Sequence, residues 1–353
     1  MNLKKRILIA PLNWGLGHAT RCIPIIKELI MYGFEPVIAS DGNALLLLQK
    51  EFPGLLSIEL PAYNIRYPKK GKYLKLKLLK ASPNLLRVIK SERKATKEIV
   101  QTYNISGIIS DSRFGVYTEQ VPSVFVTHQL QVLSGITTWL STKMHQNIIR
   151  NFDVCWIPDT DIEPNLSGKL GHIKSSVLPI KYIGPLSRFE KKSTPIINDL
   201  LVLLSGPEPQ RTLLEEKLLY ELENYQGKVI FVKGIIEDKQ KGEYIGNIEV
   251  YNFMTSKLLE KTINNSELII SRSGYTTIMD LAKLNKKAFF IPTPRQYEQE
   301  YLSNRLTKLK IAPSCNQNEF TRDKLNEADT FHGLKSVNFD VNFKELFSLF
   351  EGE

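Results

Sequence analysis

The chain has 353 residues, 42% of them hydrophobic, and a formal net charge of +10; this length can bury two ordinary hydrophobic cores. Its three cysteines, Cys22, Cys155 and Cys315, are too widely spaced to indicate a disulfide framework or a cysteine-based metal site. No apolar run reaches the roughly 20 residues that cross a bilayer, and the basic N-terminus leads directly into a predicted strand, so we expect a cytoplasmic, two-domain protein.

The first half of the sequence alternates predicted strands with predicted helices, an order typical of a doubly wound parallel sheet. Periodicity is then lost over residues 183–195, which collect proline, glycine and charge. We therefore predict a first domain at 1–185 and a linker at 186–195. The predicted strands are 6–10, 35–39, 56–60, 105–110, 122–127 and 153–157, and the clearest helical patterns are 19–32 and 85–103.

The second half repeats this pattern and predicts a second domain of the same class at 196–353. Residues 341–350 have an amphipathic helical pattern and could pack back across either domain, the N-terminal one included. The predicted strands of this domain are 199–204, 228–232, 248–251, 267–271 and 287–291.

Much of the positive charge lies between Arg66 and Lys97, where Glu92 is the only acidic residue. Leucines alternate with the basic residues, so the region is amphipathic and suits an anionic lipid surface or a lipid-linked phosphate. A solvated helical hairpin with a basic face is the alternative. No nucleic-acid-binding motif accompanies the charge, so a nucleic-acid partner is not predicted.

A glycine-centred turn follows the first predicted strand and ends in His18. Gly15 and Gly17 allow a tight turn and the close approach of a ligand to the start of a helix. An imidazole there can take a proton from a hydroxyl near neutral pH, or it can serve only as a helix cap. Asp111, at the end of another strand, is the alternative base, or a cap that pairs with Arg113. The turn lacks the third glycine of a dinucleotide site, and the chain has no Gly-Lys-Ser/Thr loop, so neither a dehydrogenase nor an NTPase is predicted.

A second turn, Ser271-Arg272-Ser273-Gly274, supplies hydroxyls, a cation and bare backbone ahead of a helix, a combination that suits phosphate. The loop that begins at Ser205-Gly206 follows another strand of the same sheet and could share the phosphates. Asp280 could accept hydrogen bonds from a ribose diol, and Glu298-Gln299-Glu300 could hold sugar hydroxyls. Ordinary helix capping is the alternative interpretation for each of these clusters.

The second-domain motifs resemble the donor-binding half of GT-B glycosyltransferases, in particular the MurG-like family that uses UDP-sugars. The resemblance rests on Asn252-Phe253-Met254, the 271–280 turn and helix, Phe290-Ile291-Pro292, and Glu298-Gln299-Glu300 with Asn304. The first domain agrees through Gly15 to His18 and through the Val124 to Gln129 run, whereas residues 60–105 match little. The fold that it implies is GT-B: two Rossmann-like, doubly wound parallel-sheet domains that face each other across a cleft.

The resemblance also implies roles for individual residues. His18 is the candidate base, and Asn13, Gly15, Gly17 and His128 lie on the acceptor side. On the donor side it implies Phe253 and Met254 for the uracil, Asp280 for the ribose, Ser205, Gly206, Ser273, Gly274, Thr276 and Thr277 for the diphosphate region, and Glu298, Gln299 and Glu300 for the sugar, with Arg272 as a cation beside the departing diphosphate.

Three departures from the family pattern argue against the peptidoglycan enzyme itself. Asp280 stands where the family usually has glutamate, Glu300 where that enzyme has a second glutamine, and the turn before His18 has fewer glycines. Asp159-Thr160-Asp161 has the spacing of a metal motif but lies away from the predicted donor loops, so we interpret it as a loop or cap. We expect no metal and no cofactor other than the UDP-sugar co-substrate.

The sequence thus predicts an inverting, metal-independent transfer of a hexose or N-acetylhexosamine from a UDP-sugar to an acceptor hydroxyl, with a lipid-linked acceptor as one option. The products would be a polysaccharide or glycolipid of the cell envelope, and the enzyme would lie peripherally on the inner face of the plasma membrane. A UDP-sugar epimerase or hydrolase on the same fold, and a non-catalytic nucleotide-sugar-binding protein, are the alternatives.

Overall fold

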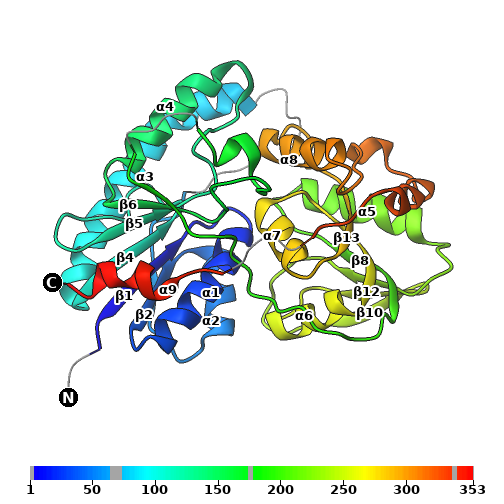
Figure 1. Cartoon of the computed structure of the whole chain (residues 1–353), viewed down its shortest axis with the longest axis horizontal. Coiled ribbons are helices and arrows are strands. Elements are labelled where there is room, and N and C mark those ends of the chain that lie inside the picture. The colour runs from blue at the N-terminus through cyan, green and yellow to red at the C-terminus, as the bar shows by residue number, and fades with distance from the viewer. Residues whose placement is uncertain (1–3, 64–73, 174–177, 336–339, 353) are drawn as a thin grey trace. The chain divides into compact units, whose positions relative to one another are not determined.

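The structure, a computed structural model, describes residues 4–63, 74–173, 178–335 and 340–352, with the side chains of 74–84 outside that description. The described chain divides into two compact units. One contains the residues up to Leu186 together with the C-terminal segment, and the other runs from Ser187 to the start of that segment. The ribbon in Figure 1 colours the first unit from blue to green, with its C-terminal helix in red.

The first unit is built on a seven-stranded sheet of order β3-β2-β1-β4-β5-β6-β7, in which every neighbouring pair is parallel. Residues 7–11 of β1 are all buried, as expected of a central strand covered on both faces. The strands are β1 (Arg6–Pro11), β2 (Glu35–Ser40), β3 (Ser57–Glu59), β4 (Ile105–Asp111), β5 (Ser123–Val126), β6 (Val154–Ile157) and β7 (Ile180–Tyr182).

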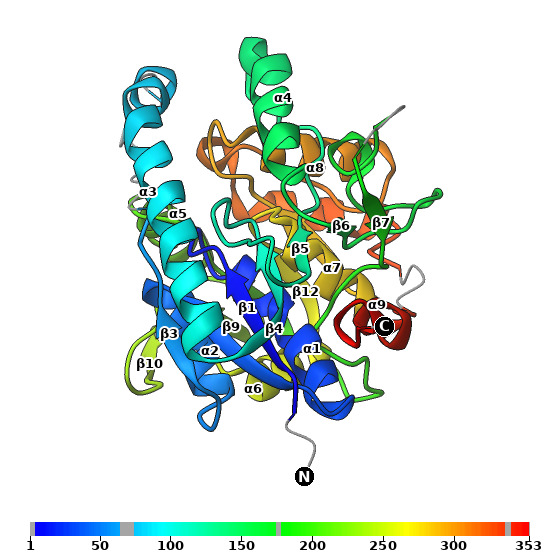
Figure 2. The same ribbon diagram turned by 90° about the vertical axis from the view of Figure 1, so that its left-hand side faces the viewer.

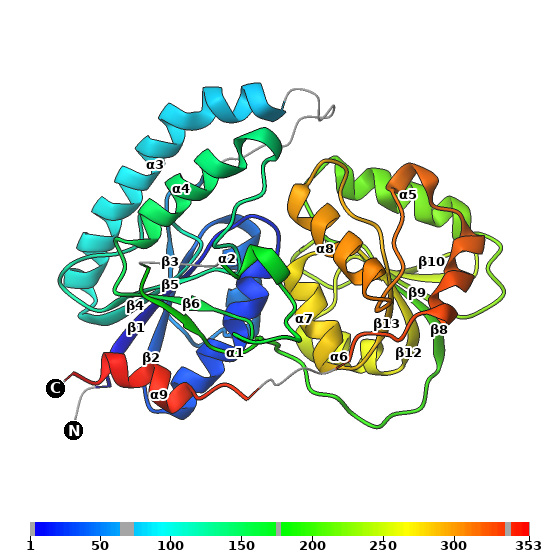
Figure 3. The same cartoon turned by 45° about the horizontal axis from the view of Figure 1, so that its top comes forward.

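Helices cover both faces of this sheet (Figure 1). Helix α1 buries a stripe that includes Ala19, Cys22, Ile23 and Ile26 at helical spacing, and the chain leaves it through Gly33 at φ 85°. Figures 2 and 3 show α3 and α4 extending past the same end of the sheet. The helices are α1 (Gly17–Met31), α2 (Gly42–Glu51), α3 (Leu74–Thr102), α4 (Thr138–Ile149) and α9 (Phe343–Phe347), with 3-10 turns η2 (Gly135–Thr137), η3 (Gly168–Leu170) and η6 (Ser348–Phe350).

The C-terminal segment packs on the first unit. Phe347 meets Tyr32 and Phe34 edge to face, and the Phe350 ring packs edge to face on Trp156. The ring of Phe350 lies so close to β4 that only a glycine fits at position 107. The last helix therefore completes the hydrophobic packing beneath this sheet.

The second unit has a six-stranded sheet of order β10-β11-β9-β8-β12-β13, parallel except for the antiparallel edge strand β10. Its core gathers apolar residues of the strands with one face of α5. The elements are β8 (Asn198–Leu203), α5 (Gln210–Leu222), β9 (Val229–Val232), β10 (Gly242–Ile245), β11 (Ile248–Tyr251), α6 (Ser256–Asn264), β12 (Ser266–Ser271), α7 (Tyr275–Lys283), β13 (Lys287–Phe290), α8 (Tyr297–Lys308), η4 (Gln317–Glu319) and η5 (Arg322–Thr330).

The doubly wound sheets predicted from the sequence are confirmed in both units, and the predicted strands agree closely with the observed ones. Two details were wrong. The second sheet is not wholly parallel, because a hairpin that turns at Gly246 adds the short, fully exposed strand β10. The helix predicted at 85–103 begins instead at Leu74.

Each sheet has one place where the strand order reverses direction. In the first sheet it lies between β1 and β4, and in the second between β8 and β12. Loops that leave neighbouring parallel strands in opposite directions there open a crevice at the carboxyl ends, where doubly wound proteins bind ligands. Both glycine-centred turns singled out in the sequence leave strands at these points: β1 leads to Gly15, and β12 leads to Gly274.

Candidate active site

The turn after β1 places His18 at the second residue of α1. Gly15 has φ 78°, a left-handed conformation that glycine adopts without strain, and the space beside its Cα is open. The His18 side chain is 18% exposed, and its Nδ1 lies 2.7 Å from Oδ1 of Asp111, the last residue of β4. The sequence interpretation treated these two residues as rival bases, whereas the structure joins them in one hydrogen bond. Asp111 therefore orients the imidazole of His18.

Asp111 is fully buried and is held by a charged partner that the sequence interpretation missed. Both Nε and Nη2 of the buried Arg21 donate to its carboxylate, one nitrogen to each oxygen. Burial alone would raise the pKa of Asp111, but the charges of Arg21 and His18 and their hydrogen bonds outweigh it and hold the pKa well below its usual range. The carboxylate is thus ionised at neutral pH and can only accept hydrogen bonds.

Arg21 also brings His128 into this cluster, since Nη1 of Arg21 lies 2.9 Å from Nδ1 of His128. The sequence did contain a signal for Arg21. It is a charged residue on the apolar stripe of α1, one turn after His18, and a cation in such a position needs a buried partner. The structure thus unites His18 and Asp111 with the acceptor-side residue His128.

A second buried arginine supports the turn from behind. Arg113 donates to Asp41 at 2.6 Å and to Glu92 at 2.7 Å. Asp41 in turn accepts from Nδ2 of Asn13 at 3.0 Å, while Oδ1 of Asn13 accepts the backbone N–H of Ala44. Asn13 therefore fixes the turn to the start of α2. Gly17, the other predicted acceptor-side residue, is the first residue of α1.

The predicted donor residues of the second unit lie in loops at one edge of its sheet, because β8, β11, β12 and β13 all run in the same direction. Ser205 and Gly206 follow β8, and Gly206 has φ 105° with open space beside it. Gly274 is the N-cap of α7, again with open space beside it. Thr276 and Thr277 lie half-buried in the first turn of α7, and the positive end of a helix dipole favours an anion.

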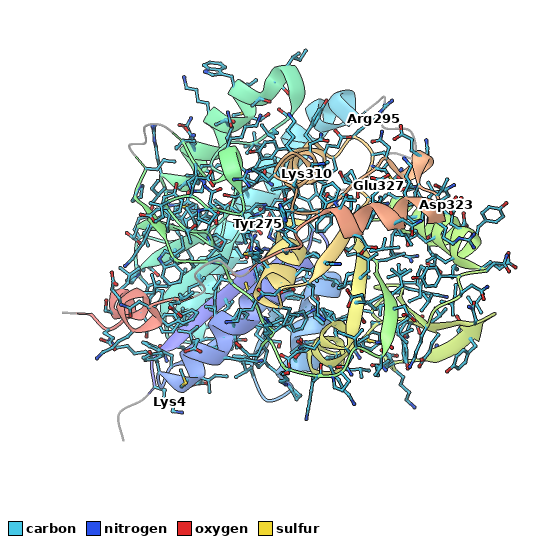
Figure 4. All side chains as sticks on the ribbon, turned by 45° about the vertical axis from the view of Figure 1, so that its right-hand side comes forward. Lys4, Tyr275, Arg295, Lys310, Asp323 and Glu327 are labelled. Carbon is cyan, nitrogen blue, oxygen red and sulfur yellow. The ribbon has the colours of Figure 1, made fainter. Side chains whose placement is uncertain are left out.

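Hydrogen bonds tie these loops together. The hydroxyl of Ser273 donates to the carbonyl of Gln299 at 2.9 Å, which joins the turn before α7 to the start of α8. Figure 4 labels Tyr275 at the start of α7 and Arg295 in the loop before α8. The Ser273 hydroxyl is buried and committed to this bond, so its backbone is the part suited to a ligand.

Arg272, which was predicted to lie beside a diphosphate, makes several hydrogen bonds within the protein. Its guanidinium is buried and donates to four acceptors: the carbonyls of Gln210, Ile291 and Pro292, and Oε1 of Gln317. Burial lowers the pKa of Arg272. Through its four acceptors the side chain connects the start of α5, the loop after β13 and η4. The contact of Arg272 with a diphosphate stays a prediction, and these four hydrogen bonds are the contacts that the structure shows for it.

Asp280 is also engaged within the protein. Its Oδ1 accepts from the hydroxyl of Ser187 at 2.6 Å, and the backbone N–H of Arg188 donates to the same carboxylate. Burial raises the pKa of Asp280 to about 6 in spite of these contacts and the charge of Arg188. The carboxylate thus anchors the segment that enters the second unit.

The predicted uracil residues follow β11. Phe253 and Met254 are both buried, and the backbone N–H of Phe253 donates to Oδ1 of Asn252 at 2.9 Å. The Asn252 side chain therefore shapes this loop.

The residues predicted for the sugar open α8. Oε1 of Gln299 accepts from the backbone N–H of Thr293 at 2.8 Å, and Oε1 of Glu300 accepts from that of Arg295 at 2.7 Å. Arg295 has φ 66°, so the bond from Glu300 stabilises an unfavourable turn. Glu298 accepts from the N-cap residue Gln296 at 3.2 Å. One oxygen of each of these side chains is thus used to shape the loop.

Asp159 is a loop residue, as expected. Its carboxylate accepts from the backbone N–H groups of Thr160, Leu166 and Ser167. Among the described residues no cluster of three or more His, Cys, Asp or Glu side chains is arranged to hold a metal ion.

Residues 210–330 match the model of the glycosyltransferase family 28 C-terminal domain. Similar proteins span most of the chain. An uncharacterized glycosyltransferase from Methanopyrus kandleri is 22% identical over 86% of this chain and 90% of its own length. The UDP-N-acetylglucosamine–N-acetylmuramyl-(pentapeptide) pyrophosphoryl-undecaprenol N-acetylglucosamine transferase from Glaesserella parasuis is 23% identical over 92% of this chain and 89% of its own.

Solved glycosyltransferases share the fold. MurG from Acinetobacter baumannii superposes with a TM-score of 0.57 at 12% identity and covers 99% of both chains. The spinosyn rhamnosyltransferase SpnG has a TM-score of 0.63 at 12% identity, over 98% of this chain and 95% of its own. The fold is thus the GT-B architecture, and the matched family 28 domain and the relatives support a glycosyltransferase.

Within that class, the matched C-terminal domain and the relatives identify the chain as MurG-like. The resemblance drawn from the sequence motifs is confirmed.

Proposed function

We propose that the protein transfers a sugar from a UDP-sugar to an acceptor hydroxyl with inversion, without a metal or other cofactor. The observation that carries this proposal is the His18–Asp111 pair at the β1/β4 switch point of a glycosyltransferase fold. A buried, ionised carboxylate behind a histidine that retains some exposure is the arrangement of a general base and its orienting group.

In the reaction, Nε2 of His18 takes the proton of the acceptor hydroxyl while the hydroxyl oxygen attacks the anomeric carbon of the sugar. The bond between that carbon and the diphosphate oxygen breaks, and its electron pair leaves with UDP. Asp111 stabilises the imidazolium that forms. The positive end of the α7 helix dipole, beside Gly274, stabilises the charge that develops on the diphosphate.

UDP is the proposed nucleotide on the basis of the sequence motifs and of the relative from Glaesserella parasuis, whose name specifies a UDP-sugar donor. The same name describes a pyrophosphoryl-undecaprenol acceptor, which supports a lipid-linked acceptor here. In the described chain, no helix combines the length and the apolar character needed to span a bilayer. A lipid-linked acceptor therefore requires another way to meet a membrane.

Exposed apolar residues on η2 and α4 support a membrane-facing surface on the first unit. Ile136 is 91% exposed and Trp139 72%, and Leu140 and Met144 are more than half exposed. Helix α4 packs inward through His145, which contacts Phe125, and leaves these side chains outside. Lys143 lies 5.2 Å from the Trp139 ring, so cationic and apolar groups are mixed as on surfaces that bind anionic lipid.

The basic region predicted at 66–97 adds to this support only in part. Arg66, Lys69, Lys70 and Lys72, and the side chains of Lys75, Lys77 and Lys80, lie outside the described residues. The described α3 residues Arg87, Lys90 and Lys97 continue the positive charge toward the sheet. We propose that α4 and the basic side of α3 bind the inner face of the plasma membrane and deliver a lipid-linked acceptor.

Two measurements test the function. A thermal-shift screen of UDP, GDP, CMP and their sugars identifies the nucleotide, since a ligand at 100 times its dissociation constant adds about 2.7 kcal/mol of stability. His18→Ala then lowers kcat by roughly 10²- to 10⁴-fold with little change in UDP affinity, and Asp111→Asn lowers it through the orientation of His18. Unchanged turnover in His18→Ala would remove the proposed base.

Incubation of the UDP-sugar without acceptor separates transfer from the alternatives. Slow hydrolysis is expected of a transferase, whereas rapid hydrolysis or epimer formation would contradict it. Tight UDP binding with no turnover on any acceptor would indicate a binding protein.

A further inference from the structure

The buried guanidinium of Arg21 contacts two histidines as well as Asp111. Nη2 of Arg21 lies 3.0 Å from Nδ1 of His18, and Nη1 lies 2.9 Å from Nδ1 of His128. A guanidinium has five N–H donors and no acceptor, and it stays charged in proteins. Every group that faces it must therefore offer a lone pair or already be directed at another acceptor.

For His18, the acceptor is Asp111. The ionised carboxylate can only accept, so the 2.7 Å contact between Nδ1 of His18 and Oδ1 of Asp111 requires a proton on Nδ1. In the neutral ring, Nε2 then carries the lone pair. Arg21 donates to both oxygens of Asp111 and holds this carboxylate in the plane where it meets His18.

For His128 the same reasoning gives the opposite tautomer. Arg21 donates through Nη1, so Nδ1 of His128 must be the unprotonated acceptor, and in the neutral ring the proton lies on Nε2. Nε2 lies 3.4 Å from the side-chain amide nitrogen of Gln129. Because the amide oxygen and nitrogen can be exchanged by a flip of the side chain, the oxygen of Gln129 is the atom that suits this N–H.

We propose that Arg21 is a positioning residue that sets opposite tautomers in the two histidines, His18 as a proton acceptor at Nε2 and His128 as a donor at Nε2. The assignment of tautomers stands on the contact of His18 with Asp111 and on the contacts of Arg21. Its catalytic meaning rests on the proposed function, in which His18 removes the proton of the acceptor hydroxyl.

The charged and titratable groups that face this cluster come from four places, and one of them is α4, where His145 interacts electrostatically with His128. Arg21 and His18 lie on α1 with the thiol of Cys22, which is 3.8 Å from Oδ2 of Asp111. Asp111 ends β4, and His128 follows β5. Arg21 is the cation that balances the negative charge of Asp111 beside His18. Without Arg21, the charge of Asp111 acts on His18 with no guanidinium to offset it. A variant without the guanidinium therefore favours the imidazolium of His18.

The test uses the full chain labelled with 15N-histidine, in which two-bond proton–nitrogen NMR spectra distinguish protonated from unprotonated ring nitrogens. The chain has five histidines, so single His→Gln variants assign the signals. At pH 8 the wild type should show a proton on Nδ1 of His18 and on Nε2 of His128. The spectra are recorded without sugar donor or sugar acceptor, so this result does not depend on the proposed reaction.

In Arg21→Met, His128 should lose its preference for the Nε2-protonated tautomer and show both tautomers. The acidic limb of the kcat/KM profile should move to higher pH by about one pH unit, a tenfold change in proton concentration. Arg21→Lys keeps the positive charge but loses the branched set of N–H donors of the guanidinium. It should therefore change the tautomer of His128 with little effect on the acidic limb of the kcat/KM profile. This variant also carries the test if Arg21→Met does not fold. Arg113→Lys is the matched control, a buried arginine paired with Asp41 and Glu92, and should leave both tautomers as in the wild type.

A proton on Nδ1 of His128 in the wild type would overturn the proposal, as would identical histidine spectra in Arg21→Met and the wild type. If the tautomers are as stated but His18→Ala transfers sugar normally, the proposed base is wrong and the role of Arg21 stands.

Discussion

Buried arginines hold together the functional loops of both units. Arg21 and Arg113 do so beside β4, and Arg272 does so at the start of α7. A buried guanidinium must find an acceptor for each donor, so it can fix several loops at once, whereas removal of the side chain leaves the acceptors buried and unpaired.

Arg272→Ala should destabilise the protein by about 3 to 5 kcal/mol, because four buried oxygens lose their donor. Urea unfolding measures this loss, and the exposed ion-pair variant Lys241→Ala serves as a control that should change little. A stable Arg272→Ala protein with weakened UDP binding would instead indicate that Arg272 contacts the diphosphate, as predicted from the sequence.

Asp280 makes stability depend on pH. Its folded pKa of about 6 lies above the ordinary value of 3.8, so the folded state binds the proton more tightly than the unfolded state. The resulting stabilisation is present below about pH 4 and is lost as the pH rises through 6. Asp280→Asn should remove up to about 2 kcal/mol of this dependence, measured by denaturant unfolding between pH 4 and 8. An equal slope in both proteins would contradict the assignment.

At the scale of elements, the order of helices and strands could be predicted from the sequence because buried parallel strands are short β-branched runs between turn residues. The 267–271 strand and its following glycine turn are an example. Strand β10 could not be predicted in this way. All four of its residues are exposed, so its sequence does not show the alternation of apolar and polar residues that marks a half-buried strand. Its pairing depends on the hairpin with β11.

The candidate active site could be predicted only in part, because some of its contacts are local in the sequence and others are not. Local motifs identify residues that follow strands, such as His18 and Gly274, because the conformation of a turn depends on residues that are adjacent in the sequence. Two partners of Arg21, Asp111 and His128, are 90 and 107 positions away in the chain, and the four acceptors of Arg272 are 19 to 62 positions away. Whether a guanidinium faces a ligand or carbonyl groups is decided by these distant contacts.

The C-terminal element offers a prediction about packing. Phe350 is buried against Trp156 and against the backbone at Gly107. Phe350→Ala should cost about 3 kcal/mol through lost burial and a cavity, measured by urea unfolding. Leu309→Ala, at a half-exposed site, is the control and should cost far less. A change of less than about 0.5 kcal/mol in Phe350→Ala would contradict the packing described for η6.

At the scale of the whole molecule, the apolar residues of η2 and α4 predict how the protein meets a membrane. Ile136→Ser with Trp139→Ser should abolish binding to anionic liposomes without loss of stability, since both side chains are exposed. Lys143→Glu should weaken binding mainly at low salt. Sedimentation with liposomes at two salt concentrations measures both effects, and Tyr220→Ser, an exposed aromatic residue on α5, is the matched control. Binding that survives the double substitution would place the membrane contact elsewhere.

The C-terminal helix also sets an order of events during synthesis. The first unit contains the earliest residues to leave the ribosome and also α9, which follows the entire second unit in the chain. Nascent β4 and β6 must wait with an uncovered apolar surface, over Gly107 and Trp156, until translation reaches Phe350. The second unit can fold while the first is unfinished, so the unit proposed to bind the donor can mature before the unit with the proposed base.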